Sequence, residues 1–139
     1  MKRTMIRAAW GILFLPLLIL TLPTGRVQAA EEFTFISTED LAKGIQEKTL
    51  TVVDANNFSV FEKNHIPTAI HVEYAHPDFN RLPGDKGAAL VFYCKNPKCG
   101  ASHEAARAAK GQGYTNVRVY PLGIDGWIAA GQSVKTGDR

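Results

Sequence analysis

The 139-residue chain has only two cysteines, Cys94 and Cys99, and neither lies in its first 30 residues. A lipoprotein is therefore excluded, because its signal would need a cysteine near the cleavage region. The arginines near the start are not adjacent, so there is no twin-arginine pattern. The sequence also contains no internal repeat, no low-complexity tract and no interior linker. The sequence therefore predicts one small domain that follows an N-terminal targeting segment.

Residues 1–29 have the features of a secretory signal. A positively charged start precedes an apolar run over residues 8–22, and small residues follow up to Ala29. The run is shorter than the roughly 20 apolar residues of a spanning helix, and Pro16 interrupts it. We expect cleavage after Ala29, a mature domain over residues 30–139, and a periplasmic or secreted location with membrane contact only through the signal. An uncleaved membrane anchor is the alternative.

The mature domain carries almost no net charge. All 13 Asp and Glu residues lie within it, while four of the 16 Lys and Arg residues belong to the signal, which leaves 12 basic residues. A near-neutral domain lacks the basic surface that nucleic acid requires, so we expect no nucleic-acid partner. Its 110 residues are enough for a hydrophobic core without disulfide or metal support.

Strand-like and helix-like segments alternate along the mature domain. This alternation predicts an α/β fold of three layers, in which helices flank a mostly parallel sheet. The uninterrupted apolar run over residues 88–93 is typical of a central strand covered on both faces. The expected strands cover residues 33–36, 50–54, 69–72, 88–93 and 117–120, and the expected helices cover residues 38–47, 58–63, 76–82, 102–112 and 126–130.

Cys94 directly follows the apolar run and precedes a helix that starts near Ser102. Ligands of parallel sheets bind beyond the carboxyl ends of the strands, so Cys94 is the candidate nucleophile. We expect the helix N-terminus and the ammonium groups of Lys95 and Lys98 to favour its thiolate. The same groups would stabilise a persulfide anion. The alternative is that Cys94 is a small buried hydrophobic residue at the end of a strand.

Five stretches of the mature domain resemble motifs of the rhodanese domain family. The segment His65-Ile66-Pro67-Thr68-Ala69-Ile70, after Phe61-Glu62, is similar to the family signature His-Ile-Pro-Gly-Ala-Ile. The other stretches are Val52-Val53-Asp54, Phe92-Tyr93-Cys94, the pair Ala105-Ala106, and Leu122-Gly123-Ile124-Asp125-Gly126-Trp127 with Ala130-Gly131. The resemblance extends over nearly the whole mature domain. It implies a five-stranded parallel sheet and a mechanism in which a cysteine carries sulfur as a persulfide.

This resemblance predicts an enzyme, a rhodanese-type sulfurtransferase. It would move sulfur from a small anion such as thiosulfate to a thiol or a protein acceptor, with no cofactor and no metal. Cys94 would be the catalytic residue, while Asp54 and His65 would support the site. The expected substrate-binding loop consists of Lys95, Asn96, Pro97, Lys98, Cys99, Gly100, Ala101 and Ser102.

The loop after Cys94 departs from the family pattern. The usual loop has four residues after the cysteine, then Arg and Ser or Thr, whereas here Cys99 takes the fifth position and the serine arrives only at Ser102. A guanidinium suits an oxyanion better than one ammonium, and Lys95 or Lys98 would substitute as point charges. A non-catalytic rhodanese module, which binds a partner protein or a sulfur anion, therefore remains an alternative.

Cys99 allows three roles. It could be a resolving thiol that closes a disulfide with Cys94, a second sulfur carrier, or a plain loop residue. The first role makes a thiol–disulfide redox protein the main rival function. Cys94, Cys99 and His103 also form a C-x₄-C-x₃-H run whose thiolates suit Cu(I) or zinc. That spacing fits no standard zinc pattern, and a fourth ligand is not visible.

Overall fold

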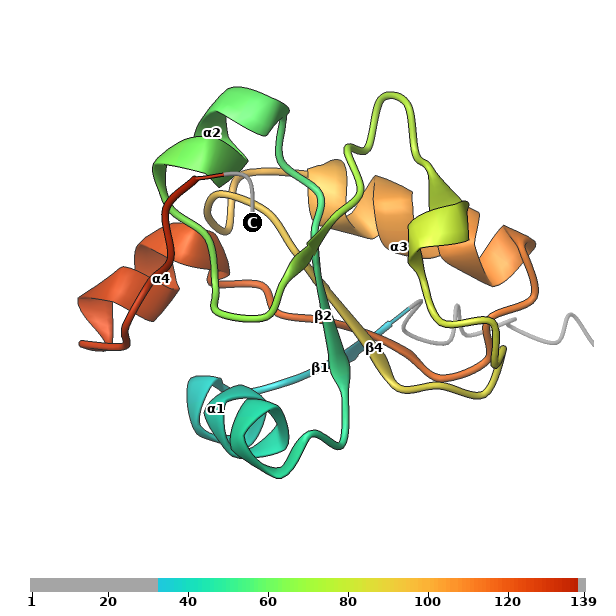
Figure 1. Cartoon of the computed structure of the whole chain (residues 1–139), viewed down its shortest axis with the longest axis horizontal. Coiled ribbons are helices and arrows are strands. Elements are labelled where there is room, and N and C mark those ends of the chain that lie inside the picture. Colours follow the sequence, from blue (N-terminus) through green and yellow to red (C-terminus); the bar gives the residue numbers. More distant parts are fainter. Residues whose placement is uncertain (1–32, 138–139) are drawn as a thin grey trace, which may run out of the picture.

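The computed structural model describes residues 33–137, which form a five-stranded parallel sheet flanked by helices (Figure 1). The strands are β1 (Thr34–Phe35), β2 (Thr51–Asp54), β3 (Ile70–His71), β4 (Leu90–Tyr93) and β5 (Val117–Val119). The helices are α1 (Thr38–Glu47), α2 (Phe58–Lys63), the 3₁₀ helix η1 (Phe79–Arg81), α3 (Ala101–Gly111) and α4 (Gly123–Ala129). The strand order is β1-β5-β4-β2-β3, and all four pairings are parallel. The predicted α/β fold is confirmed.

Strand β4 lies at the centre of the sheet, between β2 and β5. Val91 is the register partner of Val52 on one side and of Arg118 on the other. All four residues of β4 are buried. This agrees with the expectation from its continuous apolar sequence, because a central strand is covered on both faces.

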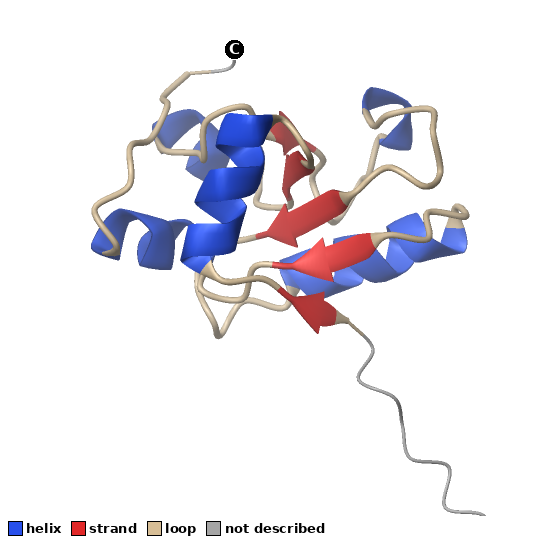
Figure 2. Ribbon diagram, turned by 90° about the horizontal axis from the view of Figure 1, so that it is seen from below, coloured by secondary structure: helices blue, strands red, loops and turns tan. Residues whose placement is uncertain are grey.

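Helices cover the two faces of the sheet (Figure 2). Successive side chains of a strand point to opposite faces. Leu90, Phe92 and Cys94 therefore share a core cluster with the alanines of α3. Val91 and Tyr93 belong to a second cluster with residues of α1 and α4. The side chain of Cys94 thus faces the layer formed by α3.

The N-terminus of α1 forms as its sequence predicts. Ser37 is the N-cap, and its hydroxyl accepts a hydrogen bond of 3.1 Å from the backbone N–H of Asp40. Glu39 and Asp40 lie in the first turn, where acidic side chains complement the helix dipole. Local sequence is enough to define this helix start.

Two other helices differ from their expected ranges. Residues 76–82 contain only the short helix η1, and α4 begins at Gly123 rather than at residue 126. The early start of α4 has a tertiary cause. The N–H groups of Ile124 and Asp125 donate to the carbonyls of Cys94 and Lys95, at 2.9 and 3.0 Å.

The segment after α4 returns to α2 (Figure 1). His65 and Lys135 exchange two backbone hydrogen bonds of 2.9 Å, and Gly137 donates to the carbonyl of Glu62 at 2.8 Å. Between residues 33 and 137 no helix is long and apolar enough to cross a bilayer. The signal expected over residues 1–29 lies outside the described residues.

Candidate active site

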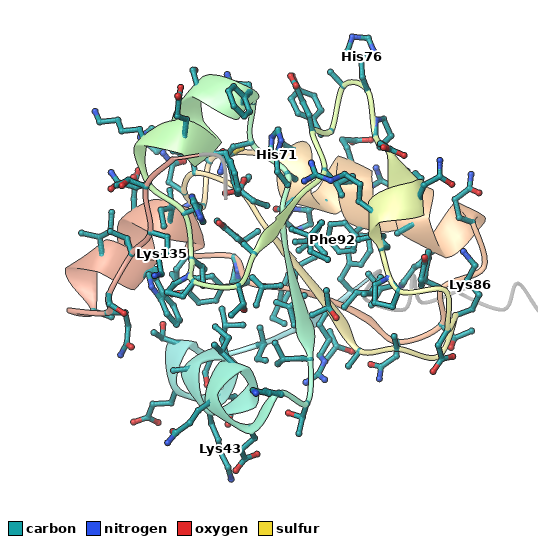
Figure 3. All side chains as sticks on the ribbon, in the orientation of Figure 1. Lys43, His71, His76, Lys86, Phe92 and Lys135 are labelled. Atoms are coloured by element: carbon teal, nitrogen blue, oxygen red, sulfur yellow. The ribbon has the colours of Figure 1, made fainter. Side chains whose placement is uncertain are left out.

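The central strand brings Cys94 to the carboxyl end of the sheet. Cys94 follows β4 directly, and its side chain lies on the same face as Phe92, which Figure 3 labels in the interior. Only 2% of the residue is exposed to solvent. The loop over residues 95–100 then leads into α3. The sulfur is therefore covered by the loop that was expected to bind substrate.

The Cys94 sulfur has two close polar partners. Its thiol donates to the backbone carbonyl of Cys99 at 3.1 Å. The hydroxyl of Ser102, in the first turn of α3, lies 3.4 Å from the sulfur. The backbone N–H of Ser102 also interacts with the sulfur. One acceptor and the donors of one serine thus surround this atom.

These surroundings favour the thiol at rest. Burial raises the pKa of Cys94, and the neighbouring Cys99 thiol acts in the same direction. The hydroxyl and amide of Ser102 lower this pKa but do not outweigh burial. The expected effect of the helix N-terminus is present, because the amide of Ser102 lowers this pKa, while Lys95 and Lys98 are not among the groups that act on it. The net preference for the thiolate that the sequence predicted is not found in this loop conformation, because desolvation outweighs the effect of Ser102.

Asn96 shapes the loop. Its side-chain oxygen accepts the N–H of Lys98 at 3.1 Å, and its backbone carbonyl accepts the N–H of Cys99 at 3.0 Å. Such a turn reverses the chain over a few residues. It brings Cys99 back to Cys94 and leaves Pro97 and Lys98 exposed on the outer side.

Helix α4 holds the first part of the loop. Besides the two backbone bonds to its N-terminus, Asp125 accepts from the side chains of Lys95 and Asn96, both at 3.3 Å. Gly123 makes this close approach possible. A Cβ there would lie 2.5 Å from the carbonyl carbon of Lys95, and its φ of 65° is in the left-handed region. The sequence pattern had placed Gly123 and Asp125 only in a closing motif, with no role at the loop.

A buried hydrogen-bond network lies beneath the site. The hydroxyl of Tyr93 donates to Asp54 and accepts the N–H of Ile66 at 3.0 Å. The other oxygen of Asp54 accepts both the backbone and the side-chain N–H of Asn56, each at 2.8 Å. Burial raises the pKa of the Asp54 carboxyl, against the effect of these bonds. Sequence reasoning missed Tyr93, although a tyrosine in a fully buried strand signals a hidden polar partner.

His65 packs against α2 and does not surround the Cys94 sulfur. Its ring nitrogen Nδ1 bonds the carbonyl of Phe61 at 2.9 Å, and the two rings stack with centroids 4.1 Å apart. His71 bonds the carbonyl of Asn56 at 2.8 Å through Nε2. Neither histidine contacts the Cys94 sulfur. Figure 3 shows His76 at the outer tip of the segment that follows β3.

The C-x₄-C-x₃-H run does not converge on one point. The ring of His103 lies edge-on to Phe33 and Phe35, with centroids 5.7 and 6.1 Å apart. In the described part of the chain no three His, Cys, Asp or Glu side chains are placed to hold a metal ion. Cys94 and Cys99, by contrast, are neighbours, and both are free thiols.

A groove of about 300 Å³ lies beside the loop. It runs between α2 and α4, and Val60, Lys63, Lys95, Asp125 and Ile128 are among the residues that line it. Cys94 is not among them, because its side chain points to the opposite face of the sheet. The groove thus borders the Lys95–Asp125 ion pair and does not reach the side chain of Cys94.

Comparison with known proteins identifies the family and the fold. The model of the Rhodanese-like domain matches residues 37–130. The thiosulfate:glutathione sulfurtransferase of Saccharomyces cerevisiae is 32% identical over 110 residues, covering 68% of this chain and 78% of the yeast protein. The thiosulfate sulfurtransferase GlpE of Pseudomonas syringae is 33% identical over 98 residues, covering 69% of this chain and 88% of GlpE.

Solved structures agree with these relatives. The BH2092 protein of Bacillus halodurans superimposes with a TM-score of 0.68 at 24% identity, covering 74% of this chain and 77% of that protein. This similarity supports the fold. Together with the family match, it confirms the resemblance drawn from the sequence motifs. The chain belongs to the rhodanese-like domain family.

Proposed function

We propose that the protein is a sulfurtransferase that carries sulfane sulfur as a persulfide on Cys94. The observation that supports this most directly is the place of Cys94 after the central strand, with its sulfur enclosed by the loop and by the first turn of α3. Family membership and the curated relatives that bear the name of thiosulfate sulfurtransferase support the same reaction class.

The reaction has two displacement steps. In the first, the Cys94 thiolate attacks the outer sulfur of thiosulfate, the sulfur–sulfur bond of the donor breaks, and sulfite leaves. In the second, a thiolate or cyanide attacks the outer sulfur of the persulfide and regenerates the Cys94 thiolate. Ser102 contributes the hydroxyl and the amide that stabilise the anionic sulfur.

The loop opens before the donor enters. Cys94 is almost fully buried, and the Cys99 carbonyl occupies one side of its sulfur. A rotation of the peptide unit after Cys99 would remove this acceptor and turn an N–H toward the site. The thiolate would then gain a donor in place of an acceptor, which lowers its free energy. Lys95 and Lys98, both exposed, attract the anionic donor to the loop.

Sulfur transfer from thiosulfate to cyanide tests the proposal. The Cys94→Ser variant should form thiocyanate no faster than a reaction without protein, because a hydroxyl does not form a persulfide. Its thermal unfolding checks that the variant is folded. Transfer by Cys94→Ser at the parental rate would refute the proposal. Thiosulfate binding without turnover by the parent would favour the non-catalytic binding module instead.

The second candidate function is a thiol–disulfide redox protein. The proximity of the free Cys94 and Cys99 thiols favours it. Intact mass distinguishes the two functions. A sulfurtransferase should release sulfite from thiosulfate, and its Cys99→Ser variant should gain one sulfur atom. A redox protein would lose two hydrogens with a disulfide substrate, release no sulfite and gain no sulfur from thiosulfate.

We also propose export of the protein. The charged start, the short apolar run and the small residues before Ala29 support this. Expression in a Gram-negative bacterium should yield a periplasmic or secreted chain that begins at Ala30. Intact mass and cell fractionation test it. A membrane-bound chain that retains residues 1–29 would indicate the anchor instead.

A further inference from the structure

We propose that Cys99 is a resolving thiol that discharges the Cys94 persulfide as sulfide and closes a Cys94–Cys99 disulfide. This gives the protein a second outlet for sulfur, which is reductive and needs no sulfur acceptor. The inference rests on the proposed persulfide function of Cys94. It concerns only what happens after that persulfide has formed.

The fold of the loop brings the two cysteines together. The turn at Asn96 reverses the chain, and the carbonyl of Cys99 lies 3.1 Å from the Cys94 sulfur. The Cys99 thiol is itself close enough to interact with the Cys94 thiol. A disulfide between residues five apart therefore requires only a local adjustment of the loop.

The burial of Cys99 supports the same role. Pro97, Lys98 and Gly100, its neighbours in the loop, are exposed. Cys99 is partly buried and packs against the core cluster that contains Cys94. Its thiol is thus held on the inner side of the loop, where an intramolecular attack benefits from proximity.

The step balances without an added oxidant. The Cys99 thiolate attacks Sγ of the Cys94 persulfide, the bond between the inner and the outer sulfur breaks, and the outer sulfur leaves as hydrosulfide. From thiosulfate and the two thiols, the products are sulfite, hydrogen sulfide and the disulfide. The sulfane sulfur gains two electrons, and the two thiols lose them. A dithiol reductant must then reopen the disulfide before the next turnover.

The direction of attack follows from the leaving groups. Attack on the outer sulfur would only move the persulfide to Cys99, and the Cys94 thiolate released beside it could take the sulfur back. Attack on the inner sulfur expels hydrosulfide, a small anion that water can solvate and that diffuses away. In the absence of an acceptor, attack on the inner sulfur is therefore the step that goes to completion.

Single-turnover measurements on the purified protein test the inference. The protein is reduced, freed of reductant, and mixed with thiosulfate in the absence of any acceptor. Sulfite and sulfide are then quantified, and the intact mass is recorded under non-reducing conditions. We expect about one sulfide per sulfite and a chain that has lost two hydrogens. In the Cys99→Ser variant, the ratio of sulfide to sulfite should fall at least ~10-fold, and the chain should retain one extra sulfur.

The ratio of sulfide to sulfite separates the attack by Cys99 from the formation of the Cys94 persulfide. Any effect of the substitution on persulfide formation changes sulfite and sulfide alike. An equal ratio in both proteins, or a parental chain that keeps its extra sulfur, would overturn the role of Cys99 and leave the proposed function intact. A persulfide found on Cys99 by peptide mapping would overturn it as well. Absence of sulfite from the parent would defeat the proposed function itself, and this inference with it.

Discussion

At the scale of single residues, the resting Cys94 sulfur faces an acceptor as well as donors. The sequence predicts where this cysteine lies, because a buried strand followed by a helix fixes its position at the carboxyl end of the sheet. It does not predict the orientation of the peptide after Cys99, since several loop conformations are compatible with the same residues. The pKa of Cys94 depends on that orientation and on burial, so the sequence predicts the helix N-terminus that lowers this pKa but not the net rise.

The raised pKa of Cys94 predicts slow alkylation at neutral pH. Below its pKa the group is a thiol, which does not attack iodoacetamide, so the rate should rise with pH into the alkaline range. Burial of the side chain lowers the alkylation rate further at every pH. Mass spectrometry of the alkylated Cys94 peptide, with free cysteine as the reference reaction, measures the profile. A rate that is already at its plateau at pH 7 would show that the thiolate is the resting form.

Thr68 stores backbone strain at the turn that follows His65. Its φ of 69° is in the left-handed region, where a β-branched residue is disfavoured. The family signature that the segment resembles has glycine here. Thr68→Gly should therefore raise the free energy of unfolding by roughly 0.5–1 kcal/mol, the relief of strain exceeding the added entropy of the unfolded chain.

Urea denaturation measures this effect. Thr136→Gly is the matched control, because Thr136 is also exposed and is not among the described non-glycine residues with positive φ. The control should lose stability, by up to about 1 kcal/mol. A loss of similar size in Thr68→Gly would mean that the threonine side chain compensates for its own backbone strain.

At the scale of elements, hydrogen bonds between segments far apart in sequence decide where some helices begin. Local sequence was sufficient for α1, whose capping residue and acidic first turn are contiguous. It was not sufficient for the start of α4, because the N–H groups of Ile124 and Asp125 bind carbonyls about 30 residues earlier in the chain. The loop after Cys94 and the N-terminus of α4 therefore form one structural unit.

Gly123 is the most restrictive residue of this unit. Gly123→Ala should lower the free energy of unfolding by about 2 kcal/mol or more, because it combines a left-handed φ with a clash against the backbone of Lys95. It should also displace the loop and lower the rate of sulfite release. Gly84→Ala is the control, since a Cβ there meets nothing within 4 Å. Equal stability of the two variants would contradict this role of Gly123.

Tyr93 connects β4 with β2 and with the turn at Ile66. Tyr93→Phe would leave the N–H of Ile66 and one oxygen of Asp54 without this partner in a fully buried region. We expect a loss of about 1–3 kcal/mol in the free energy of unfolding. Tyr74→Phe, at an exposed tyrosine, should change it by less than about 0.5 kcal/mol. Chemical denaturation of both variants measures these free energies of unfolding. Comparable losses in the two variants would refute a structural role for the Tyr93 hydroxyl.

At the scale of the whole molecule, the domain extends beyond the segment that matches the family model. The match covers residues 37–130, yet β1 pairs with β5 before it begins, and Lys135 pairs with His65 after it ends. Alternating strand and helix patterns predicted the layers and the parallel sheet correctly. They did not reveal which strands lie at the edges, because strand order depends on crossovers between segments far apart in sequence.

The N-terminal boundary of the folded unit follows from its core. Phe33 and Ile36, which flank β1, are only 4% and 7% exposed, and they pack into opposite clusters of the core. Residues 30–139 alone should therefore unfold in a single cooperative transition. A chain that starts at Thr38 lacks both side chains and the edge strand. It should lose at least about 3 kcal/mol, since burial of each large apolar side chain contributes about 1.5–3 kcal/mol. Thermal and urea denaturation of the two truncated chains measures the difference, and equal stability would place the boundary inside the family match and remove β1 from the folded unit.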